Sequence, residues 1–185
     1  MKRYVVIAGV NGAGKTTFFS TEDSFSKIEK INFDETVRSI GIWTDASDVK
    51  AAGEIVLKKI EECFERGASF SQETTLCGKS VLNNIRRASE TGYNIELYYI
   101  GLETSEIAKE RVKQRVERGG HGISDEDIER RYHESLRNLK TVLPLCDVAT
   151  VYDNSNKLTL LSVFRKGICE WRTITPPPWY VAIDL

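Results

Sequence analysis

The sequence predicts an α/β fold in which a mostly parallel central sheet is covered by helices on both faces and ends in a C-terminal β-hairpin. Apolar runs alternate with longer segments of helical period along most of the chain, which is the pattern of a parallel sheet. A glycine-rich loop stands between the first apolar run and the first helical segment. Near the C-terminus, two β-type runs flank Lys166-Gly167, which favours an antiparallel hairpin at the sheet edge.

Length and composition indicate one globular domain. The chain has 185 residues, of which 41% are hydrophobic and 29% are charged, as in ordinary domains that bury their own core. We expect one domain over residues 1–175, with a lid segment at about 111–124, and a C-terminal tail over 176–185. The net charge of −1 gives no field that would attract nucleic acid or a membrane surface, and no run is long enough for a transmembrane helix. Four scattered cysteines without a CxxC pair argue against a zinc site and favour the reducing cytoplasm.

The strands are predicted from short apolar runs bounded by turn residues. The runs that predict the parallel sheet are Tyr4–Ala8, Ile28–Asn32, Ser69–Glu73, Ile95–Leu102 and Val148–Tyr152, and those of the hairpin are Lys157–Arg165 and Ile168–Ile174. After the hairpin, three consecutive prolines at 176–178 predict an extended tail that holds Trp179 and Tyr180.

The helices are predicted from apolar residues at steps of three and four positions, as with Ile60 and Phe64. Ser124 and Asp127 resemble a capping box at the start of the last long helix. The predicted helical segments are Lys15–Ser20, Asp48–Arg66, Lys79–Glu90, Thr104–Arg118 and Ser124–Val142.

A phosphate-binding loop follows the first strand. The run Gly9-Val10-Asn11-Gly12-Ala13-Gly14-Lys15-Thr16 matches GxxxxGKT and stands between a strand and a helix, which places the fold in the P-loop NTPase and kinase class. Lys15 would reach the β- and γ-phosphates of ATP, and the Thr16 hydroxyl would ligate Mg²⁺. The expected nucleotide contacts are Gly9, Asn11, Gly12, Ala13, Gly14, Lys15, Thr16 and Thr17. The other interpretation is a glycine-rich strand–helix turn with an exposed lysine.

Among P-loop proteins, the sequence favours an ATP-dependent phosphotransferase. GTPase switch proteins need an NKxD-type guanine-binding motif, which the sequence lacks, and ABC-type ATPases need a signature loop and a much longer domain. A phosphotransferase also needs a group that accepts the proton of the attacking hydroxyl. Asp34 follows the second strand and Glu73 ends the third, so both carboxylates are candidates for the ligand crevice. The alternatives are a helix N-cap for Asp34 and an ordinary strand end for Glu73.

Three arginines precede a Gly-Gly pair and predict a lid. Arg111, Arg115 and Arg118 are spaced by four and three residues, so one helical face carries three guanidinium groups. Such groups bind phosphoryl oxygens well, although a solvated face paired with neighbouring glutamates is the alternative. His121 follows the Gly-Gly pair and is either a neutral or titrating donor or a solvent-exposed side chain.

Taken together, these motifs resemble the zeta toxin family, in its compact chromosomal branch, over nearly the whole chain to about Ser155. Its ETT-LxG and GGH elements are more specific than the P-loop. The motifs are the P-loop, Asn32-Phe33-Asp34, Glu73-Thr74-Thr75-Leu76-Cys77-Gly78, Arg111-Val112 through Gly119-Gly120-His121, Arg130-Arg131-Tyr132 with Leu136-Arg137-Asn138-Leu139, and Tyr152-Asp153-Asn154-Ser155.

The resemblance implies a kinase that uses ATP and Mg²⁺ to phosphorylate the 3′-hydroxyl of the amino sugar in UDP-N-acetylglucosamine. It implies Asp34 as general base, Lys15 on ATP, and Glu73 with Thr75 on the sugar nucleotide. His121 falls where the family places a lid arginine, so Arg111 or Arg115 must supply the other. The resemblance further implies a small helical antitoxin that blocks the ATP site as a partner.

Three smaller questions stay open at the level of sequence. Asn154 follows the last parallel strand, where it either contacts the adenine or forms a polar turn. Trp43 and Trp171 are interpreted as packing residues rather than base-stacking platforms. The competing function is a nucleotide-binding regulatory ATPase that acts through a protein partner.

Overall fold

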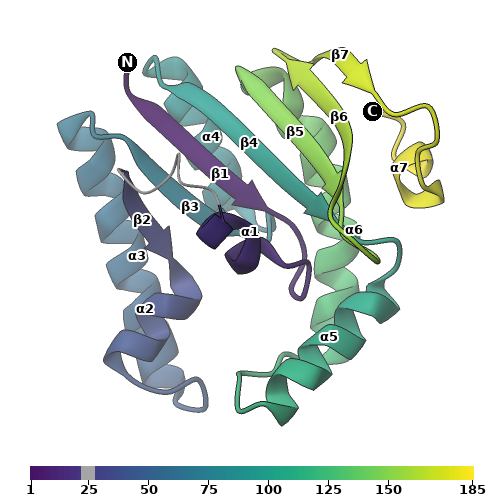
Figure 1. Ribbon diagram of the computed structural model, residues 1–185. Coiled ribbons are helices and arrows are strands. Elements are labelled where there is room, and N and C mark those ends of the chain that lie inside the picture. The colour runs from purple at the N-terminus through teal and green to yellow at the C-terminus, as the bar shows by residue number, and fades with distance from the viewer. Residues whose placement is uncertain (22–27) are drawn as a thin grey trace.

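The computed structural model describes residues 1–21 and 28–185. Within these residues, seven strands form one sheet in the order β2-β3-β1-β4-β5-β6-β7 (Figure 1). The strands are β1 (Arg3–Ala8), β2 (Glu29–Asn32), β3 (Phe70–Thr74), β4 (Asn94–Gly101), β5 (Val148–Asp153), β6 (Thr159–Arg165) and β7 (Ile168–Arg172).

The sheet is parallel from β2 to β5 and antiparallel at its C-terminal edge. Strand β1 lies in the middle of the parallel part, with β3 on one side and β4 on the other. Strands β5, β6 and β7 pair antiparallel, so the predicted hairpin lies at the edge of the sheet. The mostly parallel α/β architecture predicted from the alternation of apolar and helical segments is therefore confirmed.

Helices connect the parallel strands and cover the sheet. In Figure 1, α4 and α6 lie behind the sheet and α1 lies in front of it. The helices are α1 (Lys15–Thr21), α2 (Phe33–Ile40), α3 (Ala46–Arg66), α4 (Lys79–Glu90), α5 (Ser105–Glu117), α6 (Asp125–Val142) and α7 (Pro178–Ala182), with a 3-10 turn, η2, at Leu143–Leu145.

Two apolar clusters hold these layers together. The larger one packs α3, α4, the end of α6 and the C-terminal segment against one face of the sheet, with Tyr4 and Tyr99 fully buried in it. The smaller one packs α1, α5 and the start of α6 around the P-loop, and includes Phe18 and Val112. Because the P-loop side chains Val10 and Ala13 belong to this second cluster, the loop is anchored in the core.

The C-terminal segment differs from the expectation of an extended tail. Pro178 begins the short helix α7, and Trp179 and Tyr180 are buried in the larger cluster. Proline is compatible with the first turn of a helix because its missing N–H would have no intrahelical partner there. Trp171 also differs from the expectation, since it lies on β7 with 47% of its surface exposed instead of packing in the core. Among the described residues, no helix combines the length and apolarity needed to cross a bilayer.

Candidate active site

The P-loop has a backbone that only glycine tolerates at three of its positions, and the approach is closest at Gly9 and Gly14. Gly9 has a φ of +145°, and a Cβ there would lie 2.2 Å from the Ile100 carbonyl oxygen. Gly14 has a φ of +93°, and a Cβ there would lie 2.6 Å from Nδ2 of Asn154. These close approaches leave the loop curled at the start of α1, with its N–H groups near the helix N-terminus. Such an arrangement suits a bound phosphate.

Lys15 is buried inside this loop. Its side chain donates a hydrogen bond from Nζ to the carbonyl oxygen of Val10 at 3.2 Å, and only 8% of the residue is exposed. Burial lowers the pKa of Lys15, while the carboxylates of Glu73 and Asp34 act in the opposite direction. The ammonium group is therefore poorly compensated within the protein, which makes it a strong binder for an added anion. The alternative of an exposed lysine on an ordinary turn is wrong.

Glu73 meets the P-loop at the carboxyl end of β3. Its carboxylate accepts hydrogen bonds from the Thr16 hydroxyl at 2.9 Å and from Nδ2 of Asn32 at 2.7 Å. Burial raises the pKa of Glu73, and the neighbouring Lys15 ammonium opposes this shift. The side chains of Thr16 and Glu73 thus present oxygen atoms at one point, and oxygen is the ligand that Mg²⁺ prefers.

Asp34 lies in the first turn of α2, where the sequence allowed either a catalytic base or a helix cap. The capping residue is Asn32, whose side chain accepts a hydrogen bond from the Glu35 N–H at 3.1 Å. The N-cap interpretation of Asp34 is therefore wrong. Its carboxylate Oδ2 instead lies 3.4 Å from Nε2 of His121, and 32% of the side chain is exposed.

His121 is buried, so the alternative of a solvent-exposed side chain is wrong. Its ring stacks on Trp43 with centroids 3.9 Å apart and planes at 13°. Trp43 also meets Phe33 edge to face at 5.5 Å, so it packs between two rings, as the sequence predicted. Burial lowers the pKa of His121, Asp34 opposes this effect, and Arg115 adds to it.

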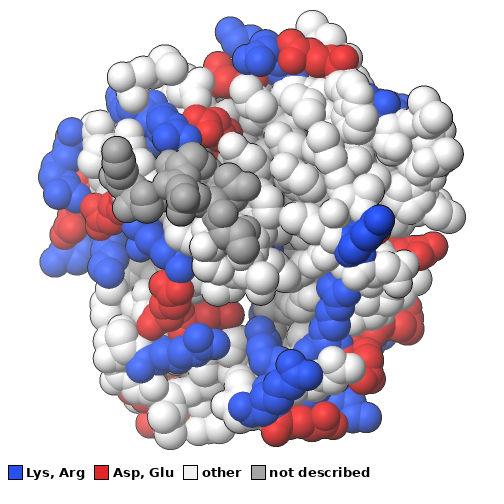
Figure 2. All heavy atoms as spheres, in the orientation of Figure 1, with Lys and Arg blue, Asp and Glu red and all other residues white. Residues whose placement is uncertain are grey.

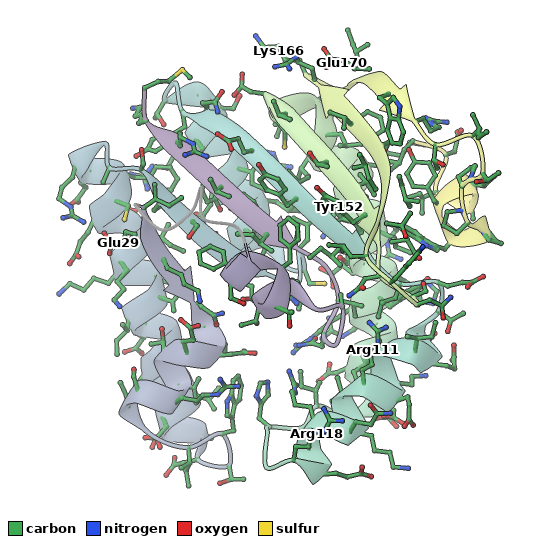
Figure 3. The ribbon with its side chains drawn as sticks, viewed as in Figure 1. Glu29, Arg111, Arg118, Tyr152, Lys166 and Glu170 are labelled. Atoms are coloured by element: carbon green, nitrogen blue, oxygen red, sulfur yellow. The ribbon has the colours of Figure 1, made fainter. Side chains whose placement is uncertain are left out.

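The three arginines of the predicted lid have different roles. Arg111 donates to the carbonyl oxygens of Gly12, at 3.4 Å, and Ser155, at 2.9 Å. Arg115 donates from Nε to the His121 carbonyl oxygen at 3.1 Å, and burial lowers its pKa. Arg118 is exposed at the end of α5, and Figure 3 shows it farther from the P-loop than Arg111.

Two hollows share the P-loop as a common wall. The first, of about 290 Å³, lies over the loop and is bounded by Arg111 and Arg115. The second, of about 420 Å³, extends toward Phe33, Trp43 and Ile123. Two lobes flank the opening to these hollows: one is formed by α2 and the start of α3, and the other by α5, the loop after it and the start of α6 (Figure 1). In Figure 2, Lys and Arg side chains gather along the α5 side of this opening. The residues common to both hollows are Asn11, Lys15, Asn32, Asp34 and Glu73.

The structure brings almost all of the predicted site residues together. Thr75 lines the second hollow, and Thr17 lines the first. Asn154 donates from Nδ2 to the carbonyl oxygen of Ala13 at 2.8 Å, so it supports the P-loop directly.

Sequence reasoning left Trp43 out of the site and did not decide which arginine of the Arg130-Arg131 pair faces the nucleotide. Arg131 lines the second hollow and donates to Oδ1 of Asn11 at 3.2 Å, whereas its neighbour Arg130 pairs with Asp127 at the surface. Helical phase could have found Arg131, because it lies three residues after the buried Ile128. No comparable signal marked Trp43, whose partner His121 is distant in the sequence.

Comparison with known proteins places the chain in a family. A model of the family described as Zeta toxin matches residues 44–163, which include Glu73, Thr75 and the predicted lid segment. An uncharacterized protein of Haemophilus influenzae is 30% identical over 128 residues, which cover 69% of this chain and 91% of that protein.

Solved structures of low sequence identity have the same fold. The complex AvrRxo1-ORF1:AvrRxo1-ORF2 with sulphate ions matches with a TM-score of 0.75 and 15% identity over 99% of this chain, and its complex with ATP matches with 0.70 and 16% over 92%. The PezAT chromosomal toxin–antitoxin system of Streptococcus pneumoniae matches with 0.59 and 15%, over 99% of this chain and 76% of that chain. The present chain spans 63% and 60% of the two AvrRxo1 chains. With its matched family segment and its intact phosphate-binding loop, the chain belongs to the zeta toxin family of P-loop kinases.

Proposed function

We propose that the protein transfers the γ-phosphoryl group of ATP to a hydroxyl of a sugar nucleotide such as UDP-N-acetylglucosamine. The observation that carries this proposal is the position of Asp34, which lines both the hollow over the P-loop and the adjoining hollow. A carboxylate at that boundary can contact a hydroxyl held in the second hollow while the γ-phosphate occupies the first. This is the placement that a general base for phosphoryl transfer needs.

The nucleotide side of the reaction is assigned to the P-loop and the arginines. Lys15 would bind the β- and γ-phosphates, and Arg111 and Arg115 border the same hollow from α5. Mg²⁺ would be held by the Thr16 hydroxyl, with the Glu73 carboxylate in hydrogen-bond contact with that hydroxyl. The metal supplies charge neutralisation of the phosphates. The protein's cations supply the remaining stabilisation of the transferring group.

The acceptor side would use the second hollow. There the Asp34 carboxylate takes the proton of the acceptor hydroxyl as the hydroxyl oxygen bonds to the γ-phosphorus. The bond between that phosphorus and the oxygen bridging to the β-phosphate breaks, and ADP leaves. Phe33 and Trp43 offer an aromatic wall, and Glu73 and Thr75 offer hydrogen-bonding groups. This mixture suits a ligand that joins a planar base to a sugar.

A protein partner is part of the proposal. PezAT is a toxin–antitoxin system, and AvrRxo1-ORF1 is described in complex with AvrRxo1-ORF2. By analogy, a small protein of antitoxin type would bind over the nucleotide site of this chain. The alternative, a regulatory ATPase that acts only through a protein partner, predicts ATP hydrolysis that no acceptor stimulates.

The test is phosphate transfer from labelled ATP to a panel of sugar nucleotides. We expect Asp34→Asn to abolish transfer while calorimetry finds ATP affinity nearly unchanged, because the base acts on the acceptor. Asp125→Asn, in the exposed first turn of α6, is the matched control and should behave as the wild type. Normal turnover of Asp34→Asn would remove this residue from the mechanism. A rate of ATP hydrolysis that no sugar nucleotide changes would instead favour the regulatory ATPase.

A further inference from the structure

The C-terminal helix reaches the nucleotide site through one buried side chain. Helix α7 lies beyond the family segment, which ends at residue 163. Its Trp179 is 5% exposed, and the indole Nε1 donates a hydrogen bond to Oδ1 of Asp153 at 2.9 Å. Asp153 is the last residue of β5, so this bond joins the C-terminal segment to the carboxyl end of the parallel sheet.

The Asp153 carboxylate also fixes the turn that follows β5. It accepts hydrogen bonds from the Ser155 hydroxyl at 2.7 Å and from the Ser155 N–H at 3.3 Å. The same hydroxyl oxygen accepts a hydrogen bond from the Glu103 N–H at 2.8 Å. The turn over residues 153–155 is thus held from both sides: the Asp153 carboxylate accepts from Ser155 and Trp179, and the Ser155 hydroxyl accepts from Glu103.

This turn contacts the P-loop and Arg111, an arginine that lines the hollow over the P-loop. Asn154 donates from Nδ2 to the Ala13 carbonyl oxygen at 2.8 Å, in the middle of the loop. The Ser155 carbonyl oxygen accepts a hydrogen bond from a terminal nitrogen of Arg111 at 2.9 Å. A shift of the turn would therefore move both a P-loop anchor and a guanidinium group that borders the phosphates.

Close packing holds the indole in position. A Cβ added at Gly101 would lie 2.2 Å from the Trp179 ring, so the ring rests against the end of β4. The Gly101 carbonyl oxygen in turn accepts a hydrogen bond from the Asn154 N–H at 2.9 Å. Trp179 therefore contacts the backbone that supports the turn and also holds the carboxylate that fixes the turn's shape.

We propose that Trp179 is a positioning residue for nucleotide binding, acting through Asp153 on Asn154 and Arg111. The inference rests on the ATP use in the proposed function. It goes beyond that function by assigning a role to the C-terminal segment. Loss of the indole N–H leaves the Asp153 carboxylate with one donor fewer and loosens the turn. Nucleotide binding weakens as a result, while the acceptor hollow, which includes none of these residues, is unaffected.

The test variant is Trp179→Phe, which keeps an aromatic ring against Gly101 but removes the N–H donor. Trp171→Phe, on the exposed edge strand β7, is the matched control. We expect calorimetry with Mg²⁺ to show ATP affinity reduced roughly 3- to 10-fold in Trp179→Phe, the effect of one lost charge-assisted hydrogen bond, and unchanged in the control. The KM for ATP should rise by a similar factor while the KM for the acceptor stays constant.

A second variant keeps the inference falsifiable if Trp179→Phe alters packing. Asp153→Asn retains the shape of the side chain but weakens the acceptor, so it should reduce ATP affinity in the same way. The double variant should be no weaker than the stronger single variant, because both changes interrupt one chain of contacts. The proposed role of Trp179 would be overturned by any of three results. These are additive losses of ATP affinity in the double variant, unchanged ATP affinity in Trp179→Phe, or an equal rise of the KM values for ATP and for the acceptor.

Affinity measurements separate this inference from the proposed function. If the wild type binds ATP but phosphorylates no sugar nucleotide, the proposed acceptor is wrong, and the comparison of ATP affinities still decides the role of Trp179. A wild type that binds no ATP would overturn both.

Discussion

Replacement of His121 by phenylalanine should remove a specific pH dependence of stability. The ring is buried and stacked on Trp43, and phenylalanine preserves that stack without a titrating group. The chain has two histidines. The other, His133, has a side chain that is 57% exposed, so His133→Gln serves as a matched control.

The direction of this pH dependence follows from the environment of the His121 ring. Burial lowers the pKa of His121; the Asp34 carboxylate opposes this, and Arg115 and Arg38 add to it. In the unfolded chain the ring takes up a proton below its ordinary pKa of about 6.5, whereas the folded ring stays neutral to lower pH. Stability from the neutral ring is therefore fully present above about pH 6.5 and is lost as the pH falls toward the lowered pKa.

The size of this pH dependence is limited because His121 takes up a single proton. Between the two pKa values, the free energy of unfolding should fall by at most about 1.4 kcal/mol per pH unit because of this group alone. Denaturant unfolding of wild type and His121→Phe from pH 7.5 to pH 5 gives the difference curve, in which titrations common to both proteins cancel. We expect that difference to change by at most this slope below about pH 6.5, and His133→Gln, which removes only an exposed pair with Glu129, to depart less from the wild type. Parallel curves for wild type and His121→Phe would refute the reasoning.

Three further predictions concern the phosphate loop, α6 and the contact between the lobes. Lys15→Met should reduce turnover by about 10²–10³-fold, because it removes the cation expected on the β- and γ-phosphates; steady-state kinetics check this. Arg131→Ala should lower kcat/KM for the acceptor about tenfold, whereas Arg130→Ala, which breaks a surface ion pair, should leave it within error in the same assay. A double-mutant cycle of Trp43→Ala with His121→Ala should give a coupling energy of about 0.5–1.5 kcal/mol in unfolding, and additivity would contradict the stack.

The sequence predicted those parts of the site that depend on local spacing. The P-loop is contiguous, so its strand–loop–helix context could be read directly, and with it the roles expected of Lys15 and Thr16. Glu73 could be placed near it because the carboxyl ends of parallel strands meet at one edge of a sheet. The resemblance to a family added Asp34 as a base, and the structure places it at the boundary of the two hollows.

The parts that could not be predicted depend on contacts between distant segments. His121 follows two glycines, which suggests exposure, but its burial comes from Trp43, on the other side of the opening. The three prolines before Trp179 suggested an extended tail, because proline disfavours a helix interior. The same residue type also suits the first turn of a helix, and only the packing of Trp179 against Gly101 decides between the two.

The arrangement of the two lobes has a consequence for acceptor choice. The second hollow, which adjoins the one over the P-loop, is lined by Phe33 and Trp43 from one lobe and by Ile123 and Arg131 from the other. An acceptor that fills this hollow, as proposed, would contact both lobes, so its binding energy would also favour the contact between Trp43 and His121. In the proposed function the P-loop binds the phosphates of ATP, which every acceptor reaction shares. If the proposed function holds, acceptor specificity is therefore set by three segments, residues 33–49, 72–75 and 121–131, that the fold brings together from different parts of the chain.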